Sequence, residues 1–324
     1  MTMTADRPST SSNRRSSSSS SPSQRLKTSF AAARVSFSWF GVRKSLSSEQ
    51  KNQAAEPFDA QGAFLSATKK LIDTREEKFA AVSTIRHQIQ SLWRDLSLPY
   101  PEPGIRLIKQ ADIESFDRRM REHQTHLADA VEQLDRHFEA MKAVARDRLG
   151  SLYNEADYPT SLRDLFQVSW DFPSIQPPEY LLRLNPQLYQ QEQARMQAKF
   201  EEAVKLAETA FSVEFAKLVE HLTERLANGD SGQRKTFRDS AIGNLVEFFG
   251  RFKSLNIHSN AELDRLVETA QRAIAGVDPQ AIRDSDSLRQ QISSQLSTVA
   301  ATLDQMLVDQ PRRRILRQPK EALP

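Results

Sequence analysis

Residues 127–145 read LADAVEQLDRHFEAMKAVA, a segment in which apolar side chains recur in alternating steps of four and three. The apolar positions are Leu127, Val131, Leu134, Phe138, Met141 and Ala145. This spacing places one narrow apolar stripe along a helix, and such a stripe is buried when a second helix covers it. We therefore predict a long helix over about residues 111–149 that packs against another helix.

A second heptad pattern lies upstream, within a helix that we predict over about residues 58–96. Its apolar positions step by three and four, at Val82, Ile85, Ile89, Leu92 and Leu96. Three prolines in residues 99–104 end this helix, because proline lacks the amide hydrogen and clashes with the preceding turn. The two helices should form an antiparallel hairpin with arms about 55–60 Å long, which places a stiff tip at 99–104 far from the rest of the protein.

Two short segments that flank the hairpin alternate between apolar and polar residues, as half-buried strands do. The apolar positions are Val35, Phe37 and Trp39 in the first segment and Phe166, Val168, Trp170 and Phe172 in the second. A lone strand leaves its backbone groups unpaired, so we predict that the two segments pair as a small two-stranded β element at the base of the hairpin. Trp39 and Trp170 are then core residues near that base.

The second half of the chain is predicted to be a helical bundle. Its first helix, over about residues 186–227, follows an eleven-residue apolar repeat with about 3.67 residues per turn. Shorter helices are expected over about 235–255, 260–274 and 285–309. The predicted fold is mainly α. Its two ordered parts are residues 34–184, which hold the coiled-coil-like hairpin with its two strands, and residues 185–310, which form the C-terminal helical bundle.

Basic tails flank this predicted fold. Residues 1–33 are rich in serine and arginine, and such a composition buries too little apolar surface to offset the entropy lost on ordering. Residues 1–44 carry eight basic residues against one acidic residue, and residues 311–324 carry five against one. The whole chain has a net charge of +3, so the body between the tails is acidic. We predict two disordered tails; the first is a flexible tail, although its composition also fits an organelle transit peptide.

Composition excludes several kinds of site. The chain has no cysteine, which removes disulfides, zinc fingers, iron–sulfur clusters and thiol nucleophiles. Only 9 of 324 residues are glycine, which disfavours folds built on glycine-rich phosphate loops. Residues 229–236 resemble such a loop but lack the adjacent Gly-Lys-Ser/Thr. His123 and His126 share a helix face without a third ligand at a diagnostic spacing, so we predict that the chain holds no metal. No catalytic triad, carboxylate pair or nucleophile motif stands out either, so we predict a protein that is not an enzyme and has no cofactor.

Two groups of residues are candidates for binding a partner. Tyr100 at the proline-rich tip is either an exposed aromatic anchor, of the kind enriched in interfaces, or packs back on Trp93 and Ile105. Arg43 and Lys44 follow an aromatic segment and could contact a partner, or be the solvated start of the next helix. The tail arginines are candidates for phosphate contacts with a nucleic acid. They are Arg14, Arg15, Arg312, Arg313, Arg314 and Arg317.

Three segments, in this order and spacing, carry a family resemblance. They are residues 35–46 (VSFSWFGVRKSL), residues 156–172 (ADYPTSLRDLFQVSWDF) and residues 276–289 (GVDPQAIRDSDSLR). Together they resemble a family of bacterial and phage proteins called domain of unknown function 3150, over about residues 34–300. The family has a polar residue between the tryptophan and the glycine of the first segment, where this chain has Phe40.

The resemblance implies a helical protein that assists an ATPase. Members of the family have no assigned activity, and their genes tend to lie beside those of MoxR-type AAA+ ATPases and of proteins with von Willebrand A or cobaltochelatase-like domains. The implied function is a non-enzymatic scaffold or adaptor whose partner is an AAA+ ATPase or a von Willebrand A-type protein. The alternative is a structural protein that binds nucleic acid through its basic tails. No apolar run approaches the about 20 residues that span a bilayer, so we expect a cytoplasmic protein of a bacterial host or a phage.

Overall fold

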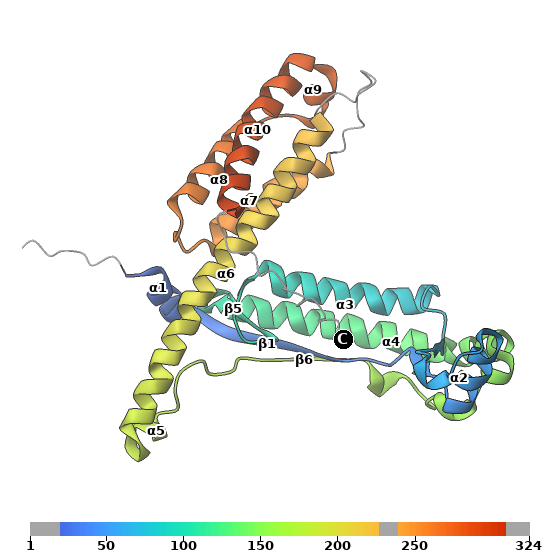
Figure 1. Cartoon of the computed structure of the whole chain (residues 1–324). Helices are drawn as coiled ribbons and strands as arrows, with labels where there is room; N and C mark the ends of the chain where they lie inside the picture. The colour runs from blue at the N-terminus through green and yellow to red at the C-terminus, as the bar shows by residue number, and fades with distance from the viewer. Residues whose placement is uncertain (1–19, 227–238, 309–324) are drawn as a thin grey trace, which may run out of the picture.

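The computed structural model of the chain describes residues 20–226 and 239–308, and helices dominate it, as the sequence predicts (Figure 1). A helical hairpin, α3 (Glu77–Asp95) and α4 (Ile113–Leu149), lies along a small sheet. A bundle of helices stands against one end of this assembly (Figure 1). The fold class is therefore confirmed as mainly α with a hairpin and a C-terminal bundle.

The heptad stripes meet inside the hairpin. Leu127, Val131 and Leu134 of α4 are buried in one core with Val82 and Ile89 of α3. The close match between stripe and core confirms the predicted seam, because only the apolar face of each helix is removed from water.

The first arm of the hairpin is shorter than predicted. Helix α3 begins at Glu77 rather than near residue 58, and a short helix, α2 (Ser48–Ala55), precedes it. Ser47 caps α2 by accepting a hydrogen bond from the amide of Gln50, and Pro57 follows directly after the helix in a single 3-10 turn, Glu56–Phe58. Proline cannot continue the helix, so the chain turns there, and the expectation of one long helix was wrong.

The predicted strand pairing is present, but in a larger sheet. Strands β1 (Phe30–Ser38) and β6 (Gln167–Asp171) pair antiparallel, with Val35 opposite Trp170. The other edge of β1 pairs with β5 (Ile105–Lys109), which pairs with β4 (Ser97–Pro99), so the sheet has the order β4-β5-β1-β6. It lies along the hairpin and is not confined to its base (Figure 1). A separate two-stranded sheet pairs β2 (Arg43–Ser45) with β3 (Thr68–Lys70).

The bundle is built on one long helix, α6 (Pro186–Leu226), as its repeat predicts. The other helices are α5 (Tyr180–Leu184), α7 (Ser240–Leu255), α8 (Ala261–Ile274), α9 (Pro279–Asp284) and α10 (Asp286–Val308). Phenylalanines fill the α6–α7 contact, where the rings of Phe215 and Phe248 stack 5.1 Å apart. Burial of such large rings contributes much of the stability of the bundle.

Part of the predicted N-terminal tail is folded. Residues 22–29 form α1 (Pro22–Ser29), which Ser21 caps, and β1 starts directly after it. Leu26 is fully buried against the bundle, and the guanidinium of Arg25 donates hydrogen bonds of 3.1 and 2.7 Å to the carbonyl of Ile257. The prediction of disorder was wrong for this part, because one leucine and one arginine find partners distant in sequence. Residues 1–19 and 311–324, which are also predicted to be disordered, lie outside the described residues.

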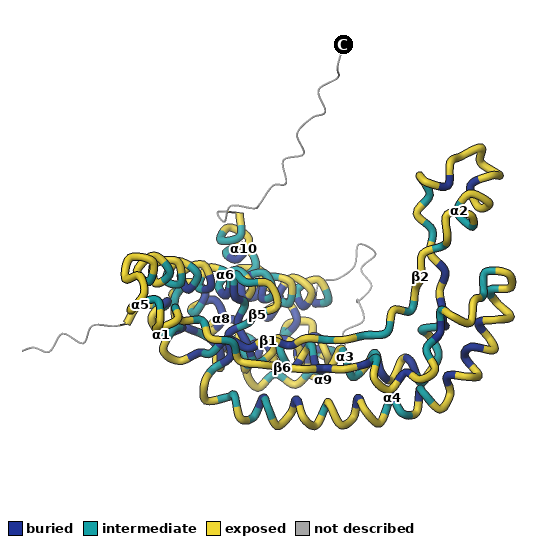
Figure 2. The backbone as a smooth tube through the Cα atoms, turned by 90° about the horizontal axis from the view of Figure 1, so that it is seen from below, coloured by how far each residue is buried: buried dark blue, intermediate teal, exposed yellow. Residues whose placement is uncertain are grey.

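The tip of the hairpin packs on the bundle instead of standing away from it. Tyr100 is only 6% exposed, and its ring lies 6.0 Å from that of Phe200 in α6. Leu98 is buried in the same core, and Lys199 forms an ion pair with Glu102. The prediction of a distant tip was therefore wrong, because the apolar tip residues are themselves part of the bundle core. Of the two alternatives for Tyr100, the exposed anchor was wrong, since the ring is buried against Phe200. The free end of the hairpin is its base, beside α2 (Figure 2).

This packing makes a prediction for Tyr100. Its hydroxyl is buried without a hydrogen-bond partner in the structure, and burial raises the pKa of Tyr100 to about 12. Tyr100→Phe should raise the free energy of unfolding by about 1 kcal/mol, because an unsatisfied buried hydroxyl is removed. Tyr100→Ala should lower it by about 3 kcal/mol through the cavity left beside Phe200. Urea unfolding of both variants measures this, and equal destabilisation by the two changes would contradict the packing.

Candidate functional site

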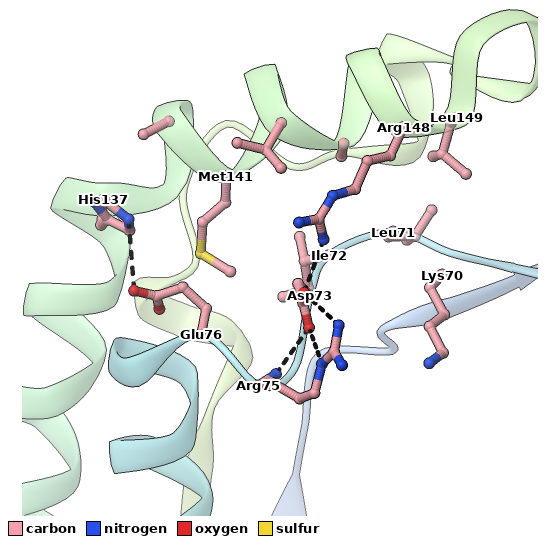
Figure 3. A pocket seen from close by; sticks show the side chains of 13 residues that line it. Lys70, Leu71, Ile72, Asp73, Arg75, Glu76, His137, Met141, Arg148 and Leu149 are labelled. Atoms are coloured by element: carbon pink, nitrogen blue, oxygen red, sulfur yellow. Dashed lines mark hydrogen bonds and ion pairs between the residues drawn. The ribbon is translucent and has the colours of Figure 1, made fainter.

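A groove lies at the free base of the hairpin, and unequal helix lengths create it. Helix α3 has 19 residues and α4 has 37. The N-cap residue of α3, Glu76, lies opposite His137 of α4, with 3.5 Å between its carboxylate oxygen and Nε2 of the imidazole. Beyond His137, α4 continues to Leu149 without α3 beside it, and residues 70–73 lie there instead (Figure 3).

The groove between these two segments has an apolar floor and a volume of about 760 Å³. Leu71, Ile72 and Met141 form buried parts of the floor, and Val144 is 46% exposed. A groove of this size and apolar character is typical of ligand or peptide binding. It is open on one side, so its floor could receive an apolar side chain from another molecule.

Charged residues border the groove, and Asp73 organises them (Figure 3). Arg75 donates to both carboxylate oxygens of Asp73 at 3.2 Å, and Nη1 of Arg148 lies 2.8 Å from one of them. These hydrogen bonds, those from Arg75 first, hold the pKa of Asp73 well below its usual range. Lys70 and Glu76 also line the groove, so three basic side chains face two acidic ones and this border has a net charge of about +1.

An ion cluster, buried at Asp157 and Lys69 and exposed at Lys44, adjoins the residues that line the groove. The carboxylate of Asp157 lies 2.5 Å from the ammonium of Lys44 and 2.5 Å from that of Lys69, and the side chains of Asp157 and Lys69 are only 4% and 6% exposed. Hydrogen bonds from both lysines lower the pKa of Asp157. Tyr158 donates a hydrogen bond of 2.8 Å to the carbonyl of Leu71, which fixes the groove floor.

Two predicted binding residues lie in this region. Arg43 and Lys44 are on β2, which pairs with β3, and Lys70 of β3 lines the groove opposite Arg43 in the ladder. Arg43 is exposed, whereas Lys44 is held by Asp157. The nearby Trp39 packs on Phe166 with 5.0 Å between ring centroids; it is half-buried and lies against the core, so the prediction of a core residue is confirmed only in part.

The remaining predicted sites do not join the groove. Tyr100 is at the opposite end of the hairpin, in the bundle core. The rings of His123 and His126 lie 6.3 Å apart, and no group of His, Asp and Glu suited to a metal ion occurs within residues 20–226 and 239–308. Residues 229–236 and the tail arginines, which include Arg14, Arg15, Arg312, Arg313, Arg314 and Arg317, lie outside the described residues.

Sequence reasoning missed the residues that make the groove. Asp73, Arg148 and Lys69 were not singled out, because each is an ordinary charged residue until its distant partner is known. Asp157 was noted only as part of the segment 156–172 that carries the resemblance. The one local signal is the run Leu71-Ile72 directly after Lys69-Lys70, which is typical of a short strand leading into a core.

Two exposed aromatic residues lie on the segment between α2 and β3, at the same end of the molecule. Phe58 and Phe64 are 81% and 88% exposed. Contiguous apolar patches mark surfaces that other molecules cover, whereas single exposed apolar side chains are common, so these two residues alone do not define a binding surface.

Comparison of the chain with protein-family models, curated proteins and solved structures gives no match. Across the two described ranges, none of the helices is both long and apolar enough to span a lipid bilayer.

Proposed function

We propose that this chain is a non-enzymatic adaptor that binds a partner protein in the groove at the base of its hairpin. The observation that carries the proposal is the open apolar floor around Val144, bordered by arginines and standing at the free end of the molecule. Interfaces typically combine an apolar centre with a polar border that excludes water and sets orientation.

The chemistry of the groove defines what it would receive. The floor suits one or two apolar side chains of a short helix or an extended segment. Arg75, whose side chain is 87% exposed, and Arg148 would pair with acidic groups beside those apolar residues. The expected partner segment is therefore apolar at its centre and acidic at one side.

The partner that we propose is a MoxR-type AAA+ ATPase, with a von Willebrand A-type protein as the other member of such a system. The support is the resemblance carried by residues 35–46, 156–172 and 276–289. Two of these segments supply structural neighbours of the groove, since Lys44 and Asp157 belong to the ion cluster that adjoins it. A scaffold with a rigid hairpin and a free end suits an adaptor that presents one surface to an ATPase.

A pair of matched valine substitutions tests the proposal. Val144→Asp puts a charge on the groove floor, whereas Val246→Asp puts the same charge on α7, where Val246 is 53% exposed. Val144→Asp should weaken binding of a MoxR-type ATPase from the same genome by about tenfold or more. The new carboxylate must lose its hydration on the apolar floor, and it competes with the acidic group of the partner for Arg148, which lies four residues further along α4. Val246→Asp should bind as the parent does. Isothermal titration calorimetry with the full chain measures both.

Each other outcome is informative. Equal affinity of the two variants would place the interface elsewhere, and failure of the parent chain to bind the ATPase would overturn the partner assignment.

The second candidate function, nucleic-acid binding, rests on the net positive charge of both tails. Binding of duplex DNA or RNA by the parent, with no binding of the ATPase, would favour that function instead.

A further inference from the structure

A second pocket lies where the hairpin tip meets the bundle, at the other end of the molecule from the groove. Residues of α3, β4, β5, α6 and α7 line it, and its volume is about 310 Å³. Leu98, Phe211 and Leu255 form an apolar wall, and three arginines converge on the space beside it. This pocket takes no part in the proposed docking groove.

The first of these arginines, Arg106 of β5, is partly buried and has neutral partners. Its Nε donates to the hydroxyl of Ser97 at 2.7 Å, and its Nη2 donates to the carbonyl of Ser97 at 2.8 Å. Within residues 20–226 and 239–308, no carboxylate forms an ion pair with Arg106. Burial first, and then the neighbouring charges of Arg94 and Arg251, lower the pKa of Arg106 to about 10.

The carboxylates of the pocket are already engaged by another arginine. Arg251 of α7 lies 3.0 Å from Asp95 and also forms an ion pair with Glu214. Arg94 lies exposed among the lining residues. The pocket therefore holds three guanidinium groups against two carboxylates, and within the described residues neither Arg94 nor Arg106 forms an ion pair with a carboxylate.

We propose that this pocket binds the phosphoryl group of a small anion, held by Arg106 and Arg94. A guanidinium presents paired donors that match the oxygens of a phosphoryl group, and such charge-assisted hydrogen bonds are strong in a partly buried site. The volume suits inorganic phosphate or a small phosphate ester, whose carbon atoms would contact Leu98 and Phe211.

Titration of the full chain with inorganic phosphate tests this, with sodium chloride at matched ionic strength as the reference. Phosphate should bind saturably and raise the melting temperature, since a ligand that binds only the folded state stabilises it. Arg94→Gln and Arg106→Gln should each weaken binding by about tenfold, as expected for loss of a charged hydrogen bond. Arg118→Gln, an exposed position on α4, is the matched control and should bind as the parent does.

Glycerol phosphate distinguishes the ligands: tighter binding of the ester assigns a phosphorylated metabolite, and equal affinity assigns inorganic phosphate.

Two results would overturn the proposal. One is a melting temperature that rises equally with phosphate and with chloride, which would show only a general salt effect. The other is unchanged phosphate affinity in both arginine variants. Arg94 is exposed, so Arg94→Gln leaves the core intact and keeps the test valid if Arg106→Gln unfolds the chain.

Discussion

Leu134→Asp is expected to lower the free energy of unfolding by about 4 kcal/mol or more, enough to unfold a marginally stable chain at room temperature. Leu134 is fully buried at the centre of the heptad stripe of α4. An aspartate there has no cationic partner in the seam, so its charge is either buried unpaired or removed by local unfolding. Leu134→Ala should cost less, about 3 kcal/mol, because it leaves only a cavity.

The same helix supplies the control for this prediction. Val144 lies ten residues further along α4 and is exposed in the groove, so Val144→Asp should change the unfolding free energy by less than about 0.5 kcal/mol. Urea unfolding followed by circular dichroism measures both variants. A native-like midpoint for Leu134→Asp would contradict the assignment of the seam.

Asp157→Ala is expected to cost about 3 kcal/mol, although it removes only one small side chain. It leaves the ammonium of Lys69 buried, with the carbonyl of Leu152 at 2.6 Å as its remaining contact. Removing one partner of a buried ion pair is more costly than removing both, because the other charge stays desolvated. The double variant Asp157→Ala with Lys69→Met should therefore recover part of the loss.

The contribution of Asp157 to the free energy of unfolding should depend on pH. The pKa of Asp157 is lowered in the folded chain, so its contribution to stability is present above the unfolded value of about 3.9 and is lost as the pH falls below it. The stability difference between the parent and Asp157→Asn should thus be largest near neutral pH and shrink below about pH 4. A difference that stays constant from pH 7 to pH 3 would show that Asp157 does not act through its charge.

The periodicity of apolar residues correctly predicted the helices that bury one continuous face along their length. The heptad of α4 and the eleven-residue repeat of α6 specify long helices because each apolar position recurs on the same side. Alternation likewise predicted that β1 pairs with β6. These patterns are local, so they can be read without knowing which other segment covers them.

The parts that sequence reasoning got wrong depend on contacts between distant residues. Nothing local indicates that Tyr100 meets Phe200, or that Leu26 is covered by the bundle, and both contacts changed the predicted arrangement of the hairpin and the tail. The groove also depends on contacts between distant residues, because it exists only where α4 extends beyond the end of α3. The charged residues around it, Asp73 and Arg148, are separated by most of the hairpin in sequence.

Hydrogen exchange of the chain in complex with a MoxR-type ATPase tests the docking groove most directly. The adaptor proposal predicts slower exchange on complex formation at residues 70–76 and 137–149, and unchanged exchange in α7, on the bundle. The Val144→Asp chain should lose the protection at the groove, and the Val246→Asp chain should keep it. Protection confined to the bundle, with exchange at 70–76 and 137–149 unchanged, would contradict the proposal.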